Sequence, residues 1–262
     1  MKREIDIKEI QKLDYGMLLE IKRICEAHNL KYYLAYGTAL GCVRHKGFIP
    51  WDYDADVVLP IKSYLEFYEI AKKELDPKYE IISGFDSDFP EYFMRMILAN
   101  QKKAEVYVDL FFFIGAPTRG CEQYKLYKKL LNLQSLRYYR FNNKVAGDSP
   151  IKSMTREVLS LVVKTIPLGL LNKRFFRISK QYDCEEAKYV YCPFGRYDLE
   201  KPRFFPKYAY GNGVDMQFCD TTFKIPSKYD YYLIEYYNNY MQYPPQEDIE
   251  RDLAKKTIIE EI

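Results

Sequence analysis

Three aspartates stand at alternating positions, 52, 54 and 56, in the segment WDYDADVVLP. Strand residues two apart point to the same face, so Asp54 and Asp56 should project together if VVLP continues as a strand. Carboxylates a few ångströms apart either share a proton or bind a cation. Mg²⁺ suits such a pair, because it prefers oxygen ligands and keeps open positions for phosphate oxygens. The spacing therefore predicts a metal site at Asp54 and Asp56.

A further acid, Asp109, is a single charge inside the apolar run VYVDLFFF. Burying an unpaired carboxylate costs on the order of several kcal/mol, so we expect it to complete a three-carboxylate metal site with the first pair. Two simpler interpretations stay open: a polar turn that exposes residues 52–56, and an edge strand that exposes Asp109. An EF-hand loop is excluded, because its required Gly and Glu positions hold Val57 and Ser63.

The segment YGTALG, residues 36–41, supplies a candidate phosphate site just upstream. Gly37 allows close approach of the backbone, and Thr38 could open a short helix whose N–H groups face an anion. A Gly-Thr pair that ends one strand, followed by Asp-x-Asp at the start of the next, resembles the arrangement by which nucleotidyltransferase-fold enzymes hold a metal-bound nucleotide.

Basic residues lie between these two motifs. Arg44, His45 and Lys46 are potential donors to phosphate oxygens, and Arg95, in YFMRMIL, is a further candidate. Ordinary solvated charge is the alternative for each of them taken singly.

The composition indicates a globular protein of 262 residues with one large or two modest domains. Forty basic against 37 acidic residues argue against a dedicated nucleic-acid binder. Aromatic residues make up 17%, which suits sugar and nucleotide surfaces but equally fits a codon bias towards tyrosine.

The six cysteines form no CxxC pair and the start is charged, so we expect a reducing cytoplasmic location without a signal peptide. No apolar run is long enough to span a bilayer.

Hydrophobic periodicity predicts an α+β fold with a nucleotidyltransferase-like mixed sheet flanked by helices. The expected helices are residues 6–28, 61–75, most of 121–182, and two in the tail around the Pro-Pro break. The expected strands are the runs KYYLAYG, DADVVLP, YEIIS, YFMRMIL and AEVYVDLFFFIG. We expect a catalytic core at 1–120 and a helical, aromatic-rich region at 121–262 that packs on it and completes the substrate site.

The chain resembles the LicD family of phosphotransferases, which includes the fukutin-related proteins. The family's hallmark, Gly-Thr-Leu-Leu-Gly-x-x-Arg-x-x-Gly-Phe-Ile-Pro-Trp-Asp-Asp-Asp-Ile-Asp, corresponds to GTALGCVRHKGFIPWDYDAD at residues 37–56. VDLFFFIGAP matches a later strand with Asp109 in register, and KIPSKYDYYLIEYYNNYMQYPP matches the C-terminal signature. The chain departs from the family at Tyr53 in place of the middle acid, at Phe112 in place of Pro, and at Asn238 where Gly is common.

The resemblance implies a transferase of substituted phosphate groups that depends on Mg²⁺, with Mn²⁺ as the alternative ion. It would move phosphocholine or a polyol phosphate from a cytidine-diphosphate donor to a hydroxyl of a cell-surface glycan or its precursor, such as teichoic acid or lipopolysaccharide. By the same resemblance Asp54, Asp56 and Asp109 bind the metal, and Asp109 also takes the proton of the attacking hydroxyl. The donor-binding set comprises Gly37, Thr38, Gly41, Arg44, Lys46, Trp51, Asp52 and Arg95.

Two other functions stay open on the sequence. One is a nucleotidyltransferase-fold enzyme that attaches a nucleotide to its acceptor, and the other is a non-catalytic glycan-binding protein of this fold. Separately, residues 151–180 combine apolar and basic residues with almost no acid. This composition is typical of a segment that lies on an anionic membrane surface, here the inner face of the cell membrane. A helix that packs on the core is the alternative for that segment.

Overall fold

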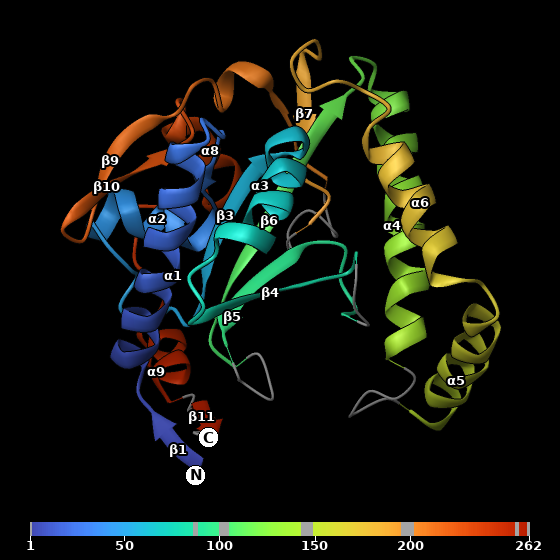
Figure 1. Ribbon diagram of the computed structural model, residues 1–262, viewed down its shortest axis with the longest axis horizontal. Helices are drawn as coiled ribbons and strands as arrows, with labels where there is room; N and C mark the ends of the chain where they lie inside the picture. Colours follow the sequence, from blue (N-terminus) through green and yellow to red (C-terminus); the bar gives the residue numbers. More distant parts are fainter. Residues whose placement is uncertain are drawn as a thin grey trace. The chain divides into compact units, whose positions relative to one another are not determined.

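A computed structural model describes residues 2–85, 89–99, 105–142, 149–194 and 202–254, and the backbone of 257–260 (Figure 1). The helices in these ranges are α1 Ile7–Ala27, α2 Tyr36–His45, α3 Ile61–Glu74, α4 Gly120–Phe141, α5 Pro150–Lys164, α6 Leu168–Ser179, the 3-10 helix η1 Lys207–Ala209, α8 Tyr229–Tyr237 and α9 Gln246–Leu253. The strands are β1 Lys2–Ile5, β2 Tyr33–Leu34, β3 Ala55–Pro60, β4 Tyr79–Ser83, β5 Met94–Leu98, β6 Tyr107–Ala116, β7 Tyr189–Tyr191, β8 Phe204–Pro206, β9 Val214–Phe218, β10 Thr221–Ile225 and β11 Thr257–Glu260.

The main sheet is mixed, with the order β2-β3-β6-β5-β4 and with β7 and β8 continuing from β6. β3 runs antiparallel to β2 and parallel to β6, and β6 runs antiparallel to β7. Figure 1 shows β3 and β6 side by side. With helices outside the sheet, this arrangement confirms the predicted α+β class. Separate antiparallel pairs join β9 to β10 and β1 to β11. The pairing of β1 with β11, from opposite ends of the chain, was not predicted.

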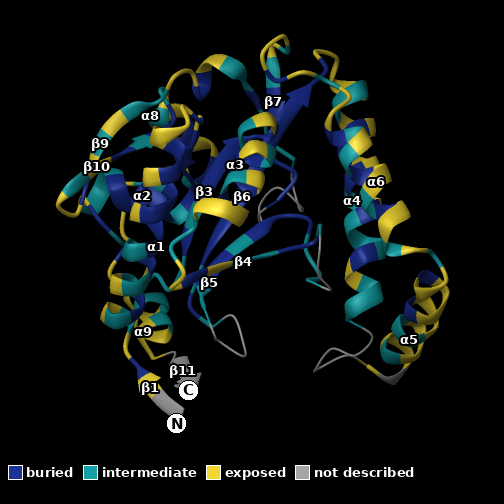
Figure 2. Cartoon of the chain, viewed as in Figure 1, coloured by how far each residue is buried: buried dark blue, intermediate teal, exposed yellow. Residues whose placement is uncertain are grey.

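The two central strands form the core because almost every side chain on them is apolar. In β6, YVDLFFFIGA, all residues after Tyr107 are buried, and in β3 only Asp56 is partly exposed. Figure 2 shows both strands as buried. Continuous apolar runs are typical of strands covered on both faces. Helix α3 contributes Tyr64 and Phe67 to this core, and the Tyr64 ring lies 4.7 Å from that of Phe112.

The predicted elements are largely confirmed, with small differences at their ends. Helix α1 matches the prediction for 6–28, and the Asp6 side chain caps it by accepting from the Glu9 backbone N–H at 2.9 Å. The predicted strand KYYLAYG contains only β2, because α2 already begins at Tyr36. Thr38 therefore lies inside the first turn of α2 and does not cap it.

The chain divides into two compact units that are each discontinuous in sequence. Unit 1 comprises residues 1–81, 95–113 and 205–262, and unit 2 comprises 82–94 and 114–204. The sequence predicts one boundary at residue 120, whereas in the structure the last 58 residues of the chain, 205–262, belong to the same unit as its start. The order of helices and strands along the sequence does not reveal that the C-terminal residues join the N-terminal unit, because this depends on contacts between segments far apart in the chain.

A buried arginine holds unit 2 together. Arg137 on α4 is fully buried, and its guanidinium donates to the carbonyl oxygens of Gly84, Phe89 and Pro90 and to the side chain of Asn172. These oxygen atoms accept the hydrogen bonds that the buried guanidinium needs, without an acidic side chain among them. The bonds fix the segment before β5 against α4 and α6.

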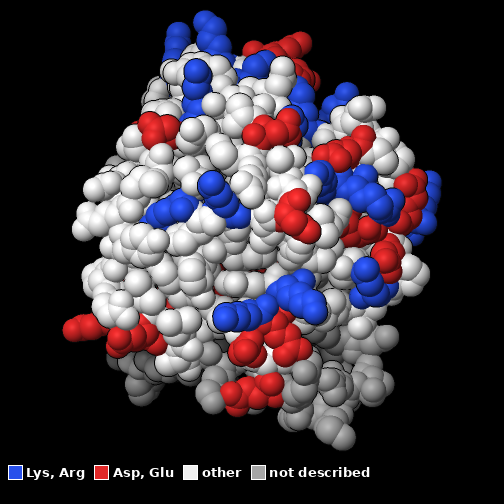
Figure 3. All heavy atoms as spheres, turned by 90° about the vertical axis from the view of Figure 1, so that its left-hand side faces the viewer, with Lys and Arg blue, Asp and Glu red and all other residues white. Residues whose placement is uncertain are grey.

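Charged side chains of both signs are interspersed on the face drawn in Figure 3, as the near balance of acids and bases predicts. Within the described residues, no helix is both long enough and apolar enough to cross a bilayer.

Candidate active site

The predicted Gly-Thr and Asp-x-Asp motifs are joined by backbone hydrogen bonds in unit 1. The Ala35 N–H donates to the Asp56 carbonyl at 2.9 Å, and the Asp56 N–H donates to the Thr38 hydroxyl at 2.8 Å. The first turn of α2 is therefore fixed against the start of β3. Thr38 is buried, so its hydroxyl positions the backbone of Asp56 in this structure.

Gly37 is required by its contact with Asp52. A Cβ atom at residue 37 would lie 2.7 Å from the Asp52 carboxylate Oδ2, a distance that real Cβ contacts essentially never show. Gly41 faces a similar limit, because its Cβ would lie 2.5 Å from the Gly47 carbonyl oxygen. These two glycines let the loop that carries Asp52 fold back onto α2.

Asp56 and Asp109 are register partners in the parallel pair β3–β6. Neighbours in register on adjacent strands project to the same face of the sheet, so the two carboxylates share one face. Asp54 precedes β3 by one residue and alternates with Asp56. Asp109 is only 6% exposed, which excludes the interpretation of an exposed edge-strand aspartate.

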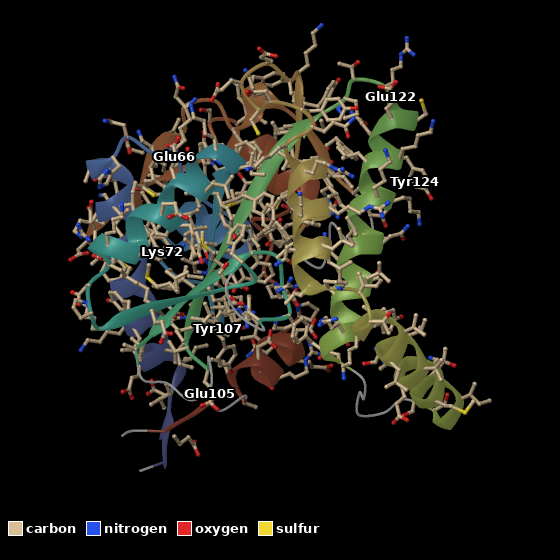
Figure 4. All side chains as sticks on the ribbon, turned by 45° about the vertical axis from the view of Figure 1, so that its right-hand side comes forward. Glu66, Lys72, Glu105, Tyr107, Glu122 and Tyr124 are labelled. Atoms are coloured by element: carbon tan, nitrogen blue, oxygen red, sulfur yellow. The ribbon has the colours of Figure 1, made fainter. Side chains whose placement is uncertain are left out.

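Arg95 on β5 is the cationic partner of Asp109. Its Nε lies 2.5 Å from Asp109 Oδ1, and its Nη2 lies 3.2 Å from Oδ2, which is a bidentate geometry. The guanidinium carbon also lies 3.9 Å from the centroid of the Tyr107 ring, at the start of β6. Figure 4 labels this tyrosine. The sequence analysis expected Arg95 to contact phosphate, and the structure brings it to the acids of the same site.

A fourth element contributes an acid that the sequence analysis missed. Asp14 on α1 is fully buried, and among the described residues neither carboxylate oxygen has a hydrogen-bond partner. Burial, followed by the charges of Asp54, Asp52 and Asp109, raises the pKa of Asp14 well above its ordinary value. The signal was present in the sequence, because Asp14 follows Ile10 by four residues and so interrupts the apolar stripe of α1.

Negative charge accumulates at this site beyond what Arg95 can balance. Burial and then the charge of Asp54 raise the pKa of Asp52 to about 8. The same two causes, in that order, raise the pKa of Asp56 well above its ordinary value, and the charge of Asp109 adds to them. Carboxylates that raise one another's pKa are typical of a site that binds a cation or keeps protons. As they stand, however, no three acid, histidine or cysteine side chains of the described residues could hold one ion together.

The remaining predicted donor-binding residues lie at the end of α2. One terminal nitrogen of Arg44, Nη1, donates to the carbonyl oxygens of Tyr240 and Gln242 at 2.8 and 3.1 Å. The Arg44 guanidinium carbon lies 4.9 Å from the centroid of the Tyr243 ring and 6.0 Å from that of Trp51. This places Arg44 and Trp51 in one cluster with the C-terminal segment.

Lys46 contacts a later segment of the chain through its backbone. It ends α2 in the left-handed conformation, with φ 57°, and its carbonyl accepts from the Cys219 N–H at 2.7 Å. Its side chain is exposed. The structure thus joins Gly37, Thr38, Asp52, Asp56, Asp109 and Arg95 by contacts, register or hydrogen bonds, and gives Arg44 and Lys46 contacts with later segments.

The three departures from the LicD pattern have local explanations. The Tyr53 hydroxyl donates to the Asp252 carbonyl on α9, so this side chain binds the C-terminal segment. Phe112 is buried against Tyr64. Asn238 ends α8 at φ 53°, a left-handed conformation that favours glycine and that asparagine tolerates better than most residues.

Comparison with known proteins finds the family that the sequence motifs resemble. Residues 29–145 match the family model described as the LicD/FKTN/FKRP nucleotidyltransferase domain. The chain is 25% identical over 262 residues to the lipopolysaccharide cholinephosphotransferase LicD of Haemophilus influenzae, an alignment that covers 94% of this chain and 95% of that protein. Shorter segments are similar to uncharacterised proteins of Rickettsia typhi, with 34% identity over 67 residues (26% of this chain, 22% of that protein), and of Rickettsia prowazekii, with 32% over 66 residues (25% and 23%).

Proposed function

We propose that this chain, whose residues 29–145 match the LicD/FKTN/FKRP nucleotidyltransferase model, transfers a phosphorylated small group from a CDP-activated donor to a hydroxyl of a cell-surface glycan or its precursor. Phosphocholine is the first candidate group, because a relative that aligns over 94% of the chain is a lipopolysaccharide cholinephosphotransferase. A polyol phosphate is the second, and it requires only a different head-group pocket.

The observation that carries the proposal is the register of Asp56 with Asp109 beside the Gly37–Asp52 contact. It places paired carboxylates next to a glycine turn at the start of a helix, which is where a metal-bound diphosphate can approach the backbone. A structural role alone does not account for this charge, because buried acids that raise one another's pKa destabilise a fold.

The donor set fits a divalent cation in chemistry and in charge. Asp54, Asp56 and Asp109 would hold Mg²⁺ or Mn²⁺ once their side chains converge on the ion, which they do not do as they stand. The buried carboxyl group of Asp14 lacks a hydrogen-bond partner among the described residues, and the same acids raise its pKa. When bound, such an ion would neutralise charge on the diphosphate and on the leaving CMP. Arg95 donates to both carboxylate oxygens of Asp109. To bind the ion, Asp109 would either share these oxygens between the guanidinium and the ion or release the guanidinium.

The protein's own residues then position the reactants. The acceptor hydroxyl oxygen forms a bond to the phosphorus that carries the head group, the bond from that phosphorus to the CMP oxygen breaks, and CMP leaves. The hydroxyl proton passes to a carboxylate of the site, for which Asp109 is our candidate. No covalent bond to the protein is required, so rate acceleration comes from alignment and from charge stabilisation.

The proposal is tested first by ligand binding. Melting temperature would be measured with CDP-choline, CDP-ribitol, CDP-glycerol and sugar nucleotides, each with Mg²⁺ and with EDTA. A ligand that binds only the folded state raises the melting temperature. We expect one CDP compound to do so in the presence of Mg²⁺ alone. No stabilisation by any nucleotide would favour the non-catalytic glycan-binding alternative.

Product analysis then separates the two enzymatic alternatives. With the donor that binds and a glycan acceptor, transfer of the head group releases free CMP and adds a phosphodiester to the acceptor. An acceptor that gains the nucleotide itself would instead show the nucleotide-attaching enzyme and overturn the proposal.

A further inference from the structure

Helix α5 of unit 2 carries an apolar face that nothing in the described chain covers. Ile151, Met154, Val158, Leu161 and Val162 are 74%, 63%, 55%, 68% and 58% exposed. Their spacing places them on one side of the helix. Figure 2 shows exposed residues along α5, and Figure 4 shows side chains that project from its outer side.

The opposite side of α5 packs against α4, so the helix is not exposed all round. Ser160 and Val163 are buried, and the Arg156 guanidinium carbon lies 5.6 and 5.5 Å from the centroids of the Tyr138 and Tyr139 rings. Arg140 of α4 donates to the carbonyl oxygens of Val163 and Lys164. This docking fixes which face of α5 points outward. Contiguous apolar surface on a soluble chain marks an interaction site.

The charge around this face is predominantly positive. Residues 149–180 contain seven basic residues and a single acid, Glu157. Lys152 and Lys164, near the two ends of α5, are exposed. A second copy of the chain would bring two such basic faces together, which disfavours self-association. The pattern of apolar face and basic border instead suits an anionic surface.

A basic groove between α4 and α6 of the same unit adds an independent observation. It encloses about 530 Å³, with apolar side chains of both helices along it and with polar groups from Lys129, Asn132, Arg174, Arg177 and Gln181. Among the residues that the structure describes, no acid forms an ion pair with Lys129, Arg174 or Arg177. Cations beside an apolar floor match the phosphate and glycerol region of a lipid headgroup.

We propose that unit 2 docks on an anionic phospholipid bilayer, with the apolar face of α5 in the bilayer interface and with the cations of the α4–α6 groove bound to lipid phosphates. The α5 face supplies burial of apolar surface, and the groove supplies the charge preference. The proposal does not depend on the chemistry assigned to unit 1, and it would bring the enzyme to acceptors that are held at a membrane.

The test is co-sedimentation of the full chain with vesicles of phosphatidylcholine alone and of phosphatidylcholine mixed with phosphatidylglycerol. We expect binding only to the mixed vesicles, weakening as NaCl is raised. Each cation near an anionic bilayer contributes about fivefold, so Arg174→Glu combined with Arg177→Glu should lower the partition coefficient at least about 25-fold. Ile151→Ser, Val158→Ser and Leu161→Ser together should lower it at least about tenfold.

Matched controls are exposed residues of unit 1, Lys62→Glu with Lys73→Glu for charge and Leu19→Ser for apolar surface, which should leave binding unchanged. Circular dichroism would check that each variant is folded. Equal binding of the groove variant and the wild type, or no binding to mixed vesicles, would overturn the proposal. So would a dimer, measured by light scattering, that the triple serine variant converts to monomer, because the α5 face would then be a contact between copies.

Discussion

Arg95 holds both carboxylate oxygens of Asp109, and it does so from the neighbouring strand, at 2.5 and 3.2 Å. This bond makes β5 part of the site and gives a buried acid a cationic partner. The charge of the same guanidinium also lowers the pKa of Asp56, against the larger opposing effects of burial and neighbouring acids.

Arg95→Gln should destabilise the metal-free protein, because it leaves Asp109 buried beside other acids. We expect a loss of about 1–3 kcal/mol in the free energy of unfolding, measured by urea titration in EDTA, with part of it recovered in Mg²⁺. The control is Arg251→Gln, which breaks an exposed pair with Asp248 on α9 and should cost less than about 1 kcal/mol. Equal effects of the two variants would contradict the central role of the Arg95–Asp109 bond.

Asp56→Asn should abolish transfer while the fold persists. We expect activity to fall at least about 100-fold, as when a single electrostatic stabiliser is lost from an active site. In EDTA the melting temperature should stay the same or rise, because one of several repelling acids is gone. Glu66→Gln, an exposed acid on α3 labelled in Figure 4, should change neither measurement. Full activity of Asp56→Asn would remove this residue from the site.

Asp14 predicts a pH dependence of stability. Its pKa in the folded protein is raised above the ordinary 3.8, so the stabilisation of its neutral form is complete below that value and is lost as pH rises through the folded-state pKa. In EDTA the melting temperature of the wild type should therefore fall from about pH 4 upwards, and that of Asp14→Asn should fall less steeply. The same slope in both proteins would show that folding does not raise the pKa of Asp14.

Gly37→Ala should disturb Asp52 directly, since the new methyl group would lie 2.7 Å from its carboxylate. We expect lower activity and a lower melting temperature than in the wild type. Gly169→Ala on α6 is the matched control, because a Cβ there meets no atom within 4 Å. That change should be neutral or stabilise by up to about 1 kcal/mol. A fully active and stable Gly37→Ala protein would mean that Asp52 can move away at no cost.

Arg44→Ala should release the C-terminal segment that its Nη1 holds at the carbonyls of Tyr240 and Gln242. We expect faster amide hydrogen exchange at residues 238–243 and a lower melting temperature. If Arg44 also binds donor phosphate, the KM for the donor rises as well. A higher donor KM with unchanged exchange and melting temperature would show that phosphate binding, and not the clamp, is its main role.

Much of the fold follows from local patterns. The boundaries of α1, α3, β3 and β4 were predicted to within a few residues because apolar spacing, Asp6 at the N-terminus of α1 and Pro77 after α3 are read from adjacent positions. The placement of Asp56 on one strand and Asp109 on another was also predicted, because both acids stand in runs of strand-forming apolar residues, whereas Asp54 lies just before its strand.

The sequence by itself determined that acids such as Asp109 enter the core, because an acid inside an apolar run is buried together with its strand. The tertiary structure decided which of them meet: the parallel register that pairs Asp56 with Asp109, the guanidinium that β5 brings to Asp109, and the Asp14 side chain that α1 adds to the cluster. It also returned residues 205–262 to the unit that contains the start of the chain. These outcomes depend on contacts between segments far apart in the chain, and the free energy of such contacts is not encoded in any local spacing.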